Sequence, residues 1–213
     1  MASDTLPSNK TPSPLLVVLS GPSGVGKDAA LDLLRKLDRP WHFVVTATTR
    51  PQRLGERDGA DYIFLDPETF ARMKDSGDFL ECAEVYGRWY GVPRSQVRMG
   101  LDAGKDVILK IDVQGAETVR SLAPEAVFIF MVPGSVGELR ERLSLRMTES
   151  SPEMELRLNT AKEELDMVDK FDYRVVNMNG RLDRAVADID AIIAAEKCRV
   201  KPRIINLTKP QSW

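Results

Sequence analysis

Residues 21–28 read Gly-Pro-Ser-Gly-Val-Gly-Lys-Asp, and the rest of the chain is interpreted outward from this stretch. An apolar run at 15–19 precedes it and predicts a buried strand, and a helical pattern over 29–37 follows it. Glycines permit backbone angles that a Cβ forbids, so that successive N–H groups can face a single concavity. The positive end of the helix and the charge of Lys27 add attraction for an anion. The stretch therefore predicts a phosphate-binding turn between a strand and a helix.

The spacing matches G-x-x-x-x-G-K, the P-loop pattern, at every position except the one after the lysine. The pattern places Ser or Thr there, with a hydroxyl that reaches Mg²⁺, whereas this chain has Asp28. A glycine-rich turn with an incidental lysine is the alternative, but the flanking strand and helix are those that the phosphate-binding mechanism needs. The predicted phosphate-binding residues are Gly21, Pro22, Ser23, Gly24, Val25, Gly26, Lys27 and Asp28.

Length and composition bound the class of protein. With 213 residues, the chain is long for one compact domain and short for two, which favours an α/β domain with inserted substructures. A formal net charge of −2 argues against a broadly basic surface that would bind nucleic acid. The two cysteines, Cys82 and Cys198, and the single histidine, His42, are too few for a disulfide framework or a histidine-based metal cluster.

The two ends of the chain have the composition of segments outside a folded core. Residues 1–14 are rich in Ser, Thr and Pro and predict a disordered leader, and residues 196–213 predict an extended arm on the surface or a partly disordered tail. No signal peptide is apparent, and no apolar run approaches the ~18 residues of a membrane span. We therefore expect a cytoplasmic protein, monomeric or homodimeric, that contacts neither membrane nor nucleic acid.

Apolar runs that alternate with helical patterns predict a parallel sheet with right-handed crossovers, in a core formed by residues 15–46 and 99–195. Residues 47–98 predict a small sheet-and-helix insertion. The predicted core strands are 15–19, 41–46, 106–112, 126–131 and 173–176, and the core helices are 29–37, 115–122, one from 136, an apolar stripe from 154 to 168, and 182–195. In the insertion we expect strands at 61–65, 81–85 and 89–92 and a helix at 67–77, and a further helix is expected at 94–103.

The predicted insertion contains the parts of a second anion site. Arg50 and Arg53 share a loop, and Tyr62 and Tyr90 supply phenolic donors. Arginine forks suit phosphate oxygens. A second phosphate site and a solvated charged loop are both compatible with these residues alone.

Three arginines surround a break between two predicted helices. Arg142 and Arg146 are four residues apart and therefore lie on one helix face, and Arg157 lies on the next helix. Such a cluster could close over a polyphosphate, with residues of about 134–157 as a lid. The alternative is a surface helix with ion pairs to Glu138, Glu141 and Glu153.

Asp112 ends a predicted core strand. The carboxyl ends of parallel strands surround the ligand crevice, where the P-loop also lies. A carboxylate there can hold Mg²⁺, directly or through water. The alternative is that Asp112 caps the helix that follows.

In this order and spacing, the residues resemble guanylate kinase, a family of P-loop nucleoside monophosphate kinases, over about 15–195. Each motif is weak by itself, but the set is highly specific. The resemblance implies a core domain, a GMP-binding insertion and a mobile lid. The motifs that carry it are SGPSGVGK at 20–27, TTRPQR-L-GE at 48–56, GADYIF at 59–64, WYG at 89–91, IDVQG at 111–115, and the arginines Arg142, Arg146 and Arg157.

The resemblance implies Mg²⁺-dependent transfer of the γ-phosphoryl group of ATP to GMP, giving ADP and GDP. Lys27 and the loop amides would hold the ATP phosphates, and Asn177 would lie near the adenine. The implied catalytic set is Lys27, Arg50, Arg142, Arg146 and Arg157; the implied GMP residues are Arg50, Arg53, Tyr62 and Tyr90 for the phosphate and Glu81 and Thr46 for the guanine edge; the implied metal residues are Asp112 and Asp28.

The sequence departs from the family pattern at three positions. Asp28 replaces the P-loop hydroxyl, Lys110 stands where the family usually has Asp or Glu, and Val92 replaces a frequent Ser or Thr beside the GMP phosphate. Because the first helix starts beside the carboxyl ends of the core strands, we expect Asp28 and Lys110 to be neighbours. The exchange would then be coupled, with Lys110 neutralising Asp28 when metal is absent; the alternative is two unrelated exchanges, with Lys110 reaching solvent.

Two rival functions remain open at this point. A non-catalytic, guanylate-kinase-like binding module is favoured by Asp28 and Lys110, but it has no need for Lys27, Asp112 and the lid arginines together. A related kinase of another phosphorylated sugar is opposed by Glu81 and Thr46, which match the donor edge of guanine.

Overall fold

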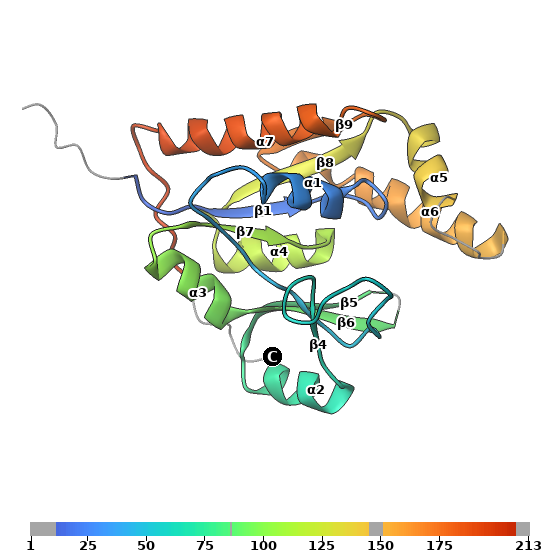
Figure 1. Cartoon of the computed structure of the whole chain (residues 1–213), viewed down its shortest axis with the longest axis horizontal. Helices are drawn as coiled ribbons and strands as arrows, with labels where there is room; N and C mark the ends of the chain where they lie inside the picture. The colour runs from blue at the N-terminus through green and yellow to red at the C-terminus, as the bar shows by residue number, and fades with distance from the viewer. Residues whose placement is uncertain (1–11, 86, 145–150, 208–213) are drawn as a thin grey trace, which may run out of the picture.

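The computed structural model describes residues 12–85, 87–144 and 151–207. Within these residues the core is a five-stranded sheet with strand order β2-β7-β1-β8-β9, in which every pair is parallel (Figure 1). The strands are β1 (Leu16–Ser20), β2 (Trp41–Phe43), β7 (Asp106–Lys110), β8 (Val127–Pro133) and β9 (Tyr173–Asn177). The predicted parallel α/β core is confirmed.

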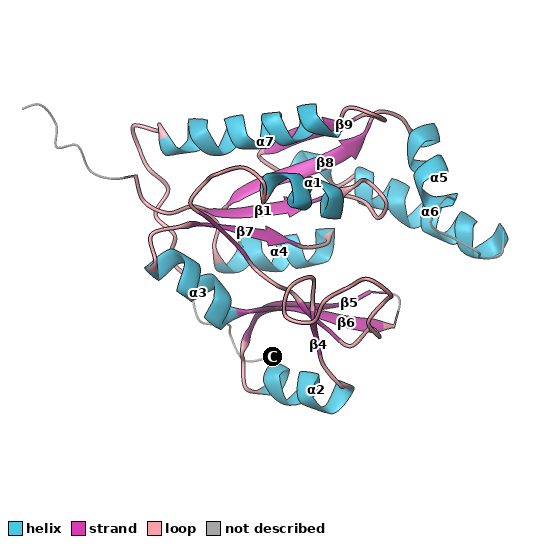
Figure 2. Cartoon of the chain, in the orientation of Figure 1, coloured by secondary structure: helices cyan, strands magenta, loops and turns pink. Residues whose placement is uncertain are grey.

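Helices cover both faces of this sheet (Figure 2), which is why its central strands are continuously apolar. On one face, α1 (Lys27–Leu34) and α7 (Leu182–Lys197) pack against alternate residues of the first strand and its approach, Leu15, Val17 and Leu19. On the other face, α3 (Arg94–Asp102) and α4 (Val113–Leu122) pack against Leu16 and Val18. The period-two alternation of β1 thus divides its side chains between two cores.

A second, four-stranded sheet has the order β4-β3-β6-β5 and lies on the α3 and α4 side of the core (Figure 1). Its strands are β3 (Ala47–Thr48), β4 (Ile63–Phe64), β5 (Phe79–Val85) and β6 (Arg88–Pro93). The helix α2 (Pro67–Asp75) covers this sheet, and Phe70 stacks on Phe79 with ring centroids 4.6 Å apart. The sheet and helix expected between 47 and 98 are therefore present.

The predicted strand 41–46 is too long, because its last residues find partners outside the core sheet. The N–H of Val45 donates to Oε1 of Gln96 at 2.8 Å. The carbonyl oxygen of Thr46 accepts from the N–H of Ile63 at 2.9 Å. These contacts carry the chain from the core sheet into the second sheet.

The helices α5 (Val136–Ser144) and α6 (Ser151–Leu165) form a satellite unit around Leu139, Leu143, Leu158 and Ala161. The predicted stripe overruns α6, because Val168 lies in the short 3₁₀ helix η1 (Val168–Lys170). Residues 145–150, with Arg146 and most of the predicted break, lie outside the described residues.

The last helix runs two residues beyond its predicted end, and the arm that follows packs against the core. Glu196 is 2% exposed, and its carboxylate accepts from the Tyr173 hydroxyl at 2.6 Å and from Nε of Arg203 at 2.9 Å. The hydrogen bond from Arg203 holds the pKa of Glu196 below its usual range. Ile205 and Leu207 then pack against the α3 and α4 side of the core. The described part of the expected surface arm is thus fixed in place.

At the amino-terminal end of the core strands, Lys197 of α7 joins the segment before β1 to the start of β7. Nζ of Lys197 donates to the carbonyl oxygen of Ser13 at 3.0 Å and to Oδ1 of Asp106 at 2.7 Å, and that carboxylate also accepts from the N–H of Leu15 at 2.8 Å. The predicted leader at 1–11 and residues 208–213 lie outside the described residues. In the part that is described, we find no helix with the length and apolar character of a membrane span.

We expect Arg203→Ala to lower the free energy of unfolding by about 3 kcal/mol, because it leaves a buried carboxylate without its main cationic partner. For a chain of this size the melting temperature would fall by roughly 6–12 °C in scanning calorimetry. Arg199→Ala is the matched control, since the Arg199 side chain is 48% exposed and lies 3.4 Å from the same carboxylate. Equal losses in the two variants would contradict this role of Arg203.

Candidate active site

The turn between β1 and α1 has a conformation that requires glycine. Gly21 and Gly26 have φ angles of 139° and 102°. A Cβ on Gly21 would lie 2.3 Å from the carbonyl oxygen of Met131 in β8, and one on Gly26 would lie 2.6 Å from Nδ2 of Asn177. The predicted glycine-rich turn is therefore present, and the helix after it begins at Lys27.

Asn177 and Arg142 hold this turn in place by hydrogen bonds to its backbone. The carbonyl oxygen of Val25 accepts from Nδ2 of Asn177 at 2.8 Å and from Nη1 of Arg142 at 3.0 Å. Arg142 also donates to the carbonyl oxygen of Asn177 and to Oδ1 of Asn179, each at 2.8 Å. The arginine guanidinium has five N–H donors in a planar, fixed geometry, which suits a contact that joins α5 to the turn and to the end of β9.

The contact of Arg142 with the transferred phosphoryl group stays a prediction. In this structure its guanidinium donates to the carbonyl oxygens of Val25 and Asn177. Arg142 lines neither of the two hollows described below. The spacing of Arg142 on its helix indicated a face but not what that face meets. Arg146 lies outside the described residues, and Arg157 lines the larger hollow.

Lys27 lies inside the turn, where its Nζ donates to the carbonyl oxygens of Gly21 and Pro22. Burial lowers the pKa of Lys27, against the opposing influence of Glu164 and Asp28. A buried ammonium at the mouth of the turn is the cation that a phosphate would meet first.

Glu164 of α6 is a site residue that the sequence did not indicate. Its Oε2 accepts from the N–H of Ser23 at 3.1 Å, so that in this structure a carboxylate contacts a turn amide that a phosphate could use. Burial raises the pKa of Glu164, opposed by the Ser23 hydrogen bond and by Lys27. The available signal was its position three residues after Ala161, on the apolar side of the helix.

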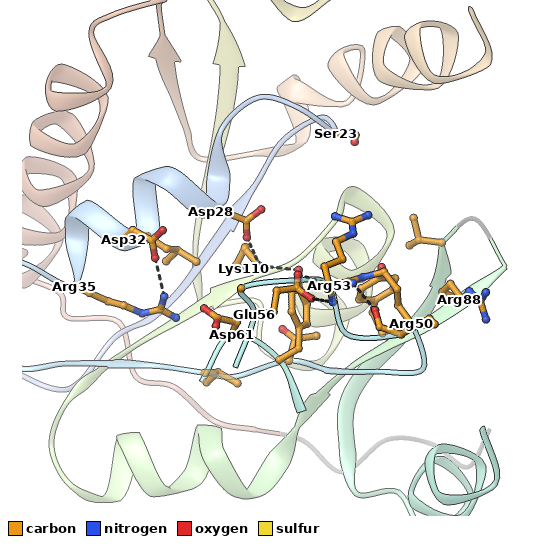
Figure 3. A pocket seen from close by; sticks show the side chains of 18 of the residues that line it. Ser23, Asp28, Asp32, Arg35, Arg50, Arg53, Glu56, Asp61, Arg88 and Lys110 are labelled. Carbon is orange, nitrogen blue, oxygen red and sulfur yellow. Dashed lines mark hydrogen bonds and ion pairs between the residues drawn. The ribbon is translucent and has the colours of Figure 1, made fainter. Parts of the chain in front are cut away.

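The larger hollow, of about 720 Å³, is the predicted arginine site (Figure 3). Nη2 of Arg50 is 2.7 Å from Oε1 of Glu56, and the Arg50 guanidinium lies 5.3 Å from the ring centroid of Tyr62. The Tyr62 and Tyr90 rings are 6.1 Å apart. Lining residues that bear on the argument are Ser23, Asp28, Thr46, Arg50, Arg53, Tyr62, Arg88, Tyr90, Lys110 and Arg157, of which Arg88 was not predicted.

A smaller adjoining hollow, of about 200 Å³, extends from the arginine site to the turn. It is lined by Thr46, Glu81 and Asp112, and also by Lys27 and Glu164. The two hollows share several walls, so that the predicted phosphate turn and the predicted guanine residues face one continuous space.

Glu81 is buried in this smaller hollow without a hydrogen-bond partner for its Oε2 among the described residues. The residue is 3% exposed. Burial, and secondarily the charge of Asp112, raise the pKa of Glu81 to about 8. A buried carboxylate without a partner is costly to stability and marks a place where a ligand with hydrogen-bond donors fits.

Asp112 caps α4, as its alternative reading predicted. Oδ1 accepts from the N–H of Gly115 at 2.7 Å. Gly115 in turn packs on Glu81, because a Cβ there would lie 2.8 Å from Oε2 of Glu81. The cap therefore positions the wall of the smaller hollow.

The phosphate turn and the arginine loop thus face each other across a continuous space. The Glu81 carboxylate lies beside this space, where it can accept hydrogen bonds from a nucleotide base. This arrangement suits two phosphate-bearing molecules held end to end, and on this fold it defines the class of P-loop kinases that phosphorylate a nucleotide.

Comparison with known proteins gives the family. The family model described as guanylate kinase matches residues 13–196. Guanylate kinase of Halalkalibacterium halodurans is 48% identical over 192 residues, 90% of this chain and 93% of that protein. Guanylate kinase 2, chloroplastic/mitochondrial, of Oryza sativa subsp. japonica is 45% identical over 197 residues, 92% of this chain and 69% of that protein. The crystal structure of guanylate kinase from Anaplasma phagocytophilum superposes with a TM-score of 0.72 at 33% identity, covering 89% of each chain. This chain belongs to the guanylate kinase family.

We expect Glu81→Gln to stabilise the ligand-free protein in a pH-dependent way. The native state holds the Glu81 proton more tightly than the unfolded chain, so stability is fully present below the ordinary pKa of 4.5 and is lost as the pH rises to about 8. Glutamine cannot ionise, so the variant should melt several degrees above the unaltered protein at about pH 8, and the difference should vanish near pH 4.5. Scanning calorimetry without nucleotides measures both; a pH-independent difference would contradict the assignment.

Proposed function

We propose that this protein transfers the γ-phosphoryl group of ATP to GMP, giving ADP and GDP. The observation that carries the proposal is the buried carboxylate of Glu81, which has no described partner at Oε2 and lies between the phosphate turn and the arginine loop. Membership of the guanylate kinase family supports it.

Base selection rests on Glu81 and Thr46. Guanine presents two adjacent donors, N1–H and the 2-amino group, which an ionised carboxylate can accept together. Adenine has an acceptor at N1 and no 2-amino group, so it would leave Glu81 unpaired. The pKa of Glu81 is raised by burial in the ligand-free protein, whereas the guanine donors favour the ionised carboxylate, so binding of guanine would lower this pKa.

The phosphate ends of the two substrates would meet between the two hollows. Lys27 and the turn amides hold the ATP phosphates, and Glu164 must leave the Ser23 amide when they bind. The GMP phosphate binds Arg50 and Arg53, and the other groups proposed to contact it are the hydroxyls of Tyr62 and Tyr90.

The role of Arg142 in our proposal is to hold the turn in place through Val25 and Asn177, whereas Arg157 contacts the transferring group from its position on the larger hollow. Arg146 keeps its proposed role with Arg157. Residues 15–46 and 99–195 act as the core, 47–98 as the GMP-binding insertion and about 134–157 as the lid. The cytoplasmic location and the monomeric or homodimeric state remain predictions.

The donor set fits Mg²⁺ as the metal that accompanies ATP. Asp28, Asp112 and Glu164 line the same hollow as Lys27. No group of three or more such ligands in the described part of the chain could hold a metal by itself. Mg²⁺ would therefore take most of its oxygen ligands from phosphate and water, with Asp112 and Asp28 as the protein contribution. The metal supplies neutralisation of phosphate charge.

The reaction needs position and charge more than side-chain chemistry. An oxygen of the GMP phosphate attacks the γ-phosphorus, the bond to the β,γ-bridging oxygen breaks, and its electron pair leaves with ADP. Lys27, Arg50 and Arg157 neutralise charge on the phosphates and align them. Excluding water from the joined hollows prevents hydrolysis of ATP.

A substrate panel tests the proposal directly. ADP formation should be fast with GMP and lower by roughly 10⁴-fold in kcat/KM with AMP, because a buried carboxylate built for donors rejects a base that lacks them. A non-catalytic binding module would give no ADP with any acceptor. A kinase of another phosphorylated sugar would give ADP with a sugar phosphate in preference to GMP.

Glu81→Gln tests the role of this carboxylate in GMP binding. Loss of the charge-assisted pair should raise KM for GMP by roughly 10–100-fold and leave KM for ATP nearly unchanged. Initial rates measured while each substrate is varied separate the two constants. Similar increases for both substrates would show that Glu81 does not read the acceptor base.

A further inference from the structure

Lys110, one of the departures from the family pattern, ends the core strand β7 between the two hollows. Its Nζ lies 2.5 Å from Oδ1 of Asp28 in the first turn of α1 and 2.9 Å from the hydroxyl of Tyr62 in the segment before β4. The expected proximity of Asp28 and Lys110 is confirmed, and the Lys110 side chain, 15% exposed, is directed to Asp28 instead of to solvent. One ammonium therefore joins the phosphate turn to the second sheet.

The position of Lys110 is shared by both hollows. Asp28, Tyr62 and Lys110 appear in the lining of each, with Lys27 on one side and Arg50 on the other. Figure 3 shows Asp28 and Lys110 facing each other, with Arg50 and Arg53 among the other side chains of the same pocket. Under the proposed function, this is where the two phosphate chains meet.

The exchange also changes the local charge. The family pattern pairs a hydroxyl with an acid, which gives a total of one negative charge, whereas Asp28 and Lys110 together are neutral. The Lys110 side chain is 15% exposed and the Asp28 side chain is 59% exposed. A cation is therefore the more buried member of the pair, in a space that must accept two polyanions.

The Lys110 ammonium faces the Asp28 carboxylate on one side and the Tyr62 hydroxyl on the other. It can therefore serve both hollows as a positive charge and a hydrogen-bond donor.

We propose that Lys110 binds a phosphate oxygen of the acceptor nucleotide at the point of phosphoryl transfer, and that Asp28 is its counter-ion in the ligand-free protein. The proposal rests on the proposed function. When GMP binds, the Lys110 ammonium exchanges part of its contact with Asp28 or Tyr62 for the phosphate, and no proton is transferred. It thus remains beside the oxygen that attacks the γ-phosphorus.

A purely structural role is the competing explanation. Lys110 could tie Tyr62 to α1 and so hold the walls of the site, without contacting phosphate. The two roles differ in what they predict for a ligand that lacks the phosphate. Guanosine shares the base and ribose of GMP, so it reports on the walls but not on the phosphate contact.

The test is the binding of GMP and of guanosine, measured by calorimetry in the presence of EDTA, to the unaltered protein, Lys110→Met and Lys110→Arg. We expect Lys110→Met to weaken GMP by roughly 10–100-fold and to leave guanosine nearly unchanged. Lys110→Arg, which keeps the charge, should retain most of the preference for GMP. Melting temperatures confirm that each variant is folded.

A double-mutant cycle on the same readout tests the counter-ion. Lys110→Asp places two acids side by side and should be the weakest GMP binder. Adding Asp28→Ser to it restores the family's usual pairing and should recover affinity by roughly 5–100-fold, far more than Asp28→Ser gains in the unaltered background.

Equal weakening of GMP and guanosine by Lys110→Met, or an unchanged affinity for both, would overturn the phosphate contact. Strict additivity in the cycle would overturn the counter-ion. Formation of ADP from ATP and GMP by the unaltered protein tests the proposed function by itself, so it separates these failures from a failure of that function. Absence of both activity and GMP binding in the unaltered protein would overturn the function and this inference together.

Discussion

The carbonyl oxygen of Val25 accepts two side-chain hydrogen bonds, from Asn177 and Arg142, and the shape of the phosphate turn depends on them. The turn contains three glycines, Gly21, Gly24 and Gly26, which restrict φ little because they lack a Cβ. Its conformation must therefore be imposed from outside, by groups at the end of β9 and on α5. The same two groups fix the satellite helices against the core sheet, so that the nucleotide site and the packing of α5 share one junction.

The sequence predicted best where the signal was local. The apolar run before Gly21 and the glycines after it specify strand, turn and helix within a few residues, and the structure has all three. The strand 41–46 was predicted too long because the partner that ends it, Gln96, is far along the chain. Side-chain periodicity contains no information about such a contact.

In the candidate site, too, local sequence signals predicted residues correctly, whereas contacts between distant segments were not predicted. Arg50 and Tyr62 were predicted together and lie together, with the guanidinium over the ring. Arg142 was placed on the correct helix, but its direction depends on Val25 and Asn177, which only the folded chain brings near. Glu164 was missed because its place on the apolar side of α6 does not show what it contacts until the helix is docked against the turn.

The hydrogen bonds around Lys197 have a practical consequence. They join the segments at Ser13 and Asp106 at the amino-terminal edge of the parallel strands, whereas the phosphate turn lies at the opposite, carboxyl edge. A tag, a fusion partner or a surface linkage placed near this junction would therefore stand on the far side of the sheet from the nucleotides.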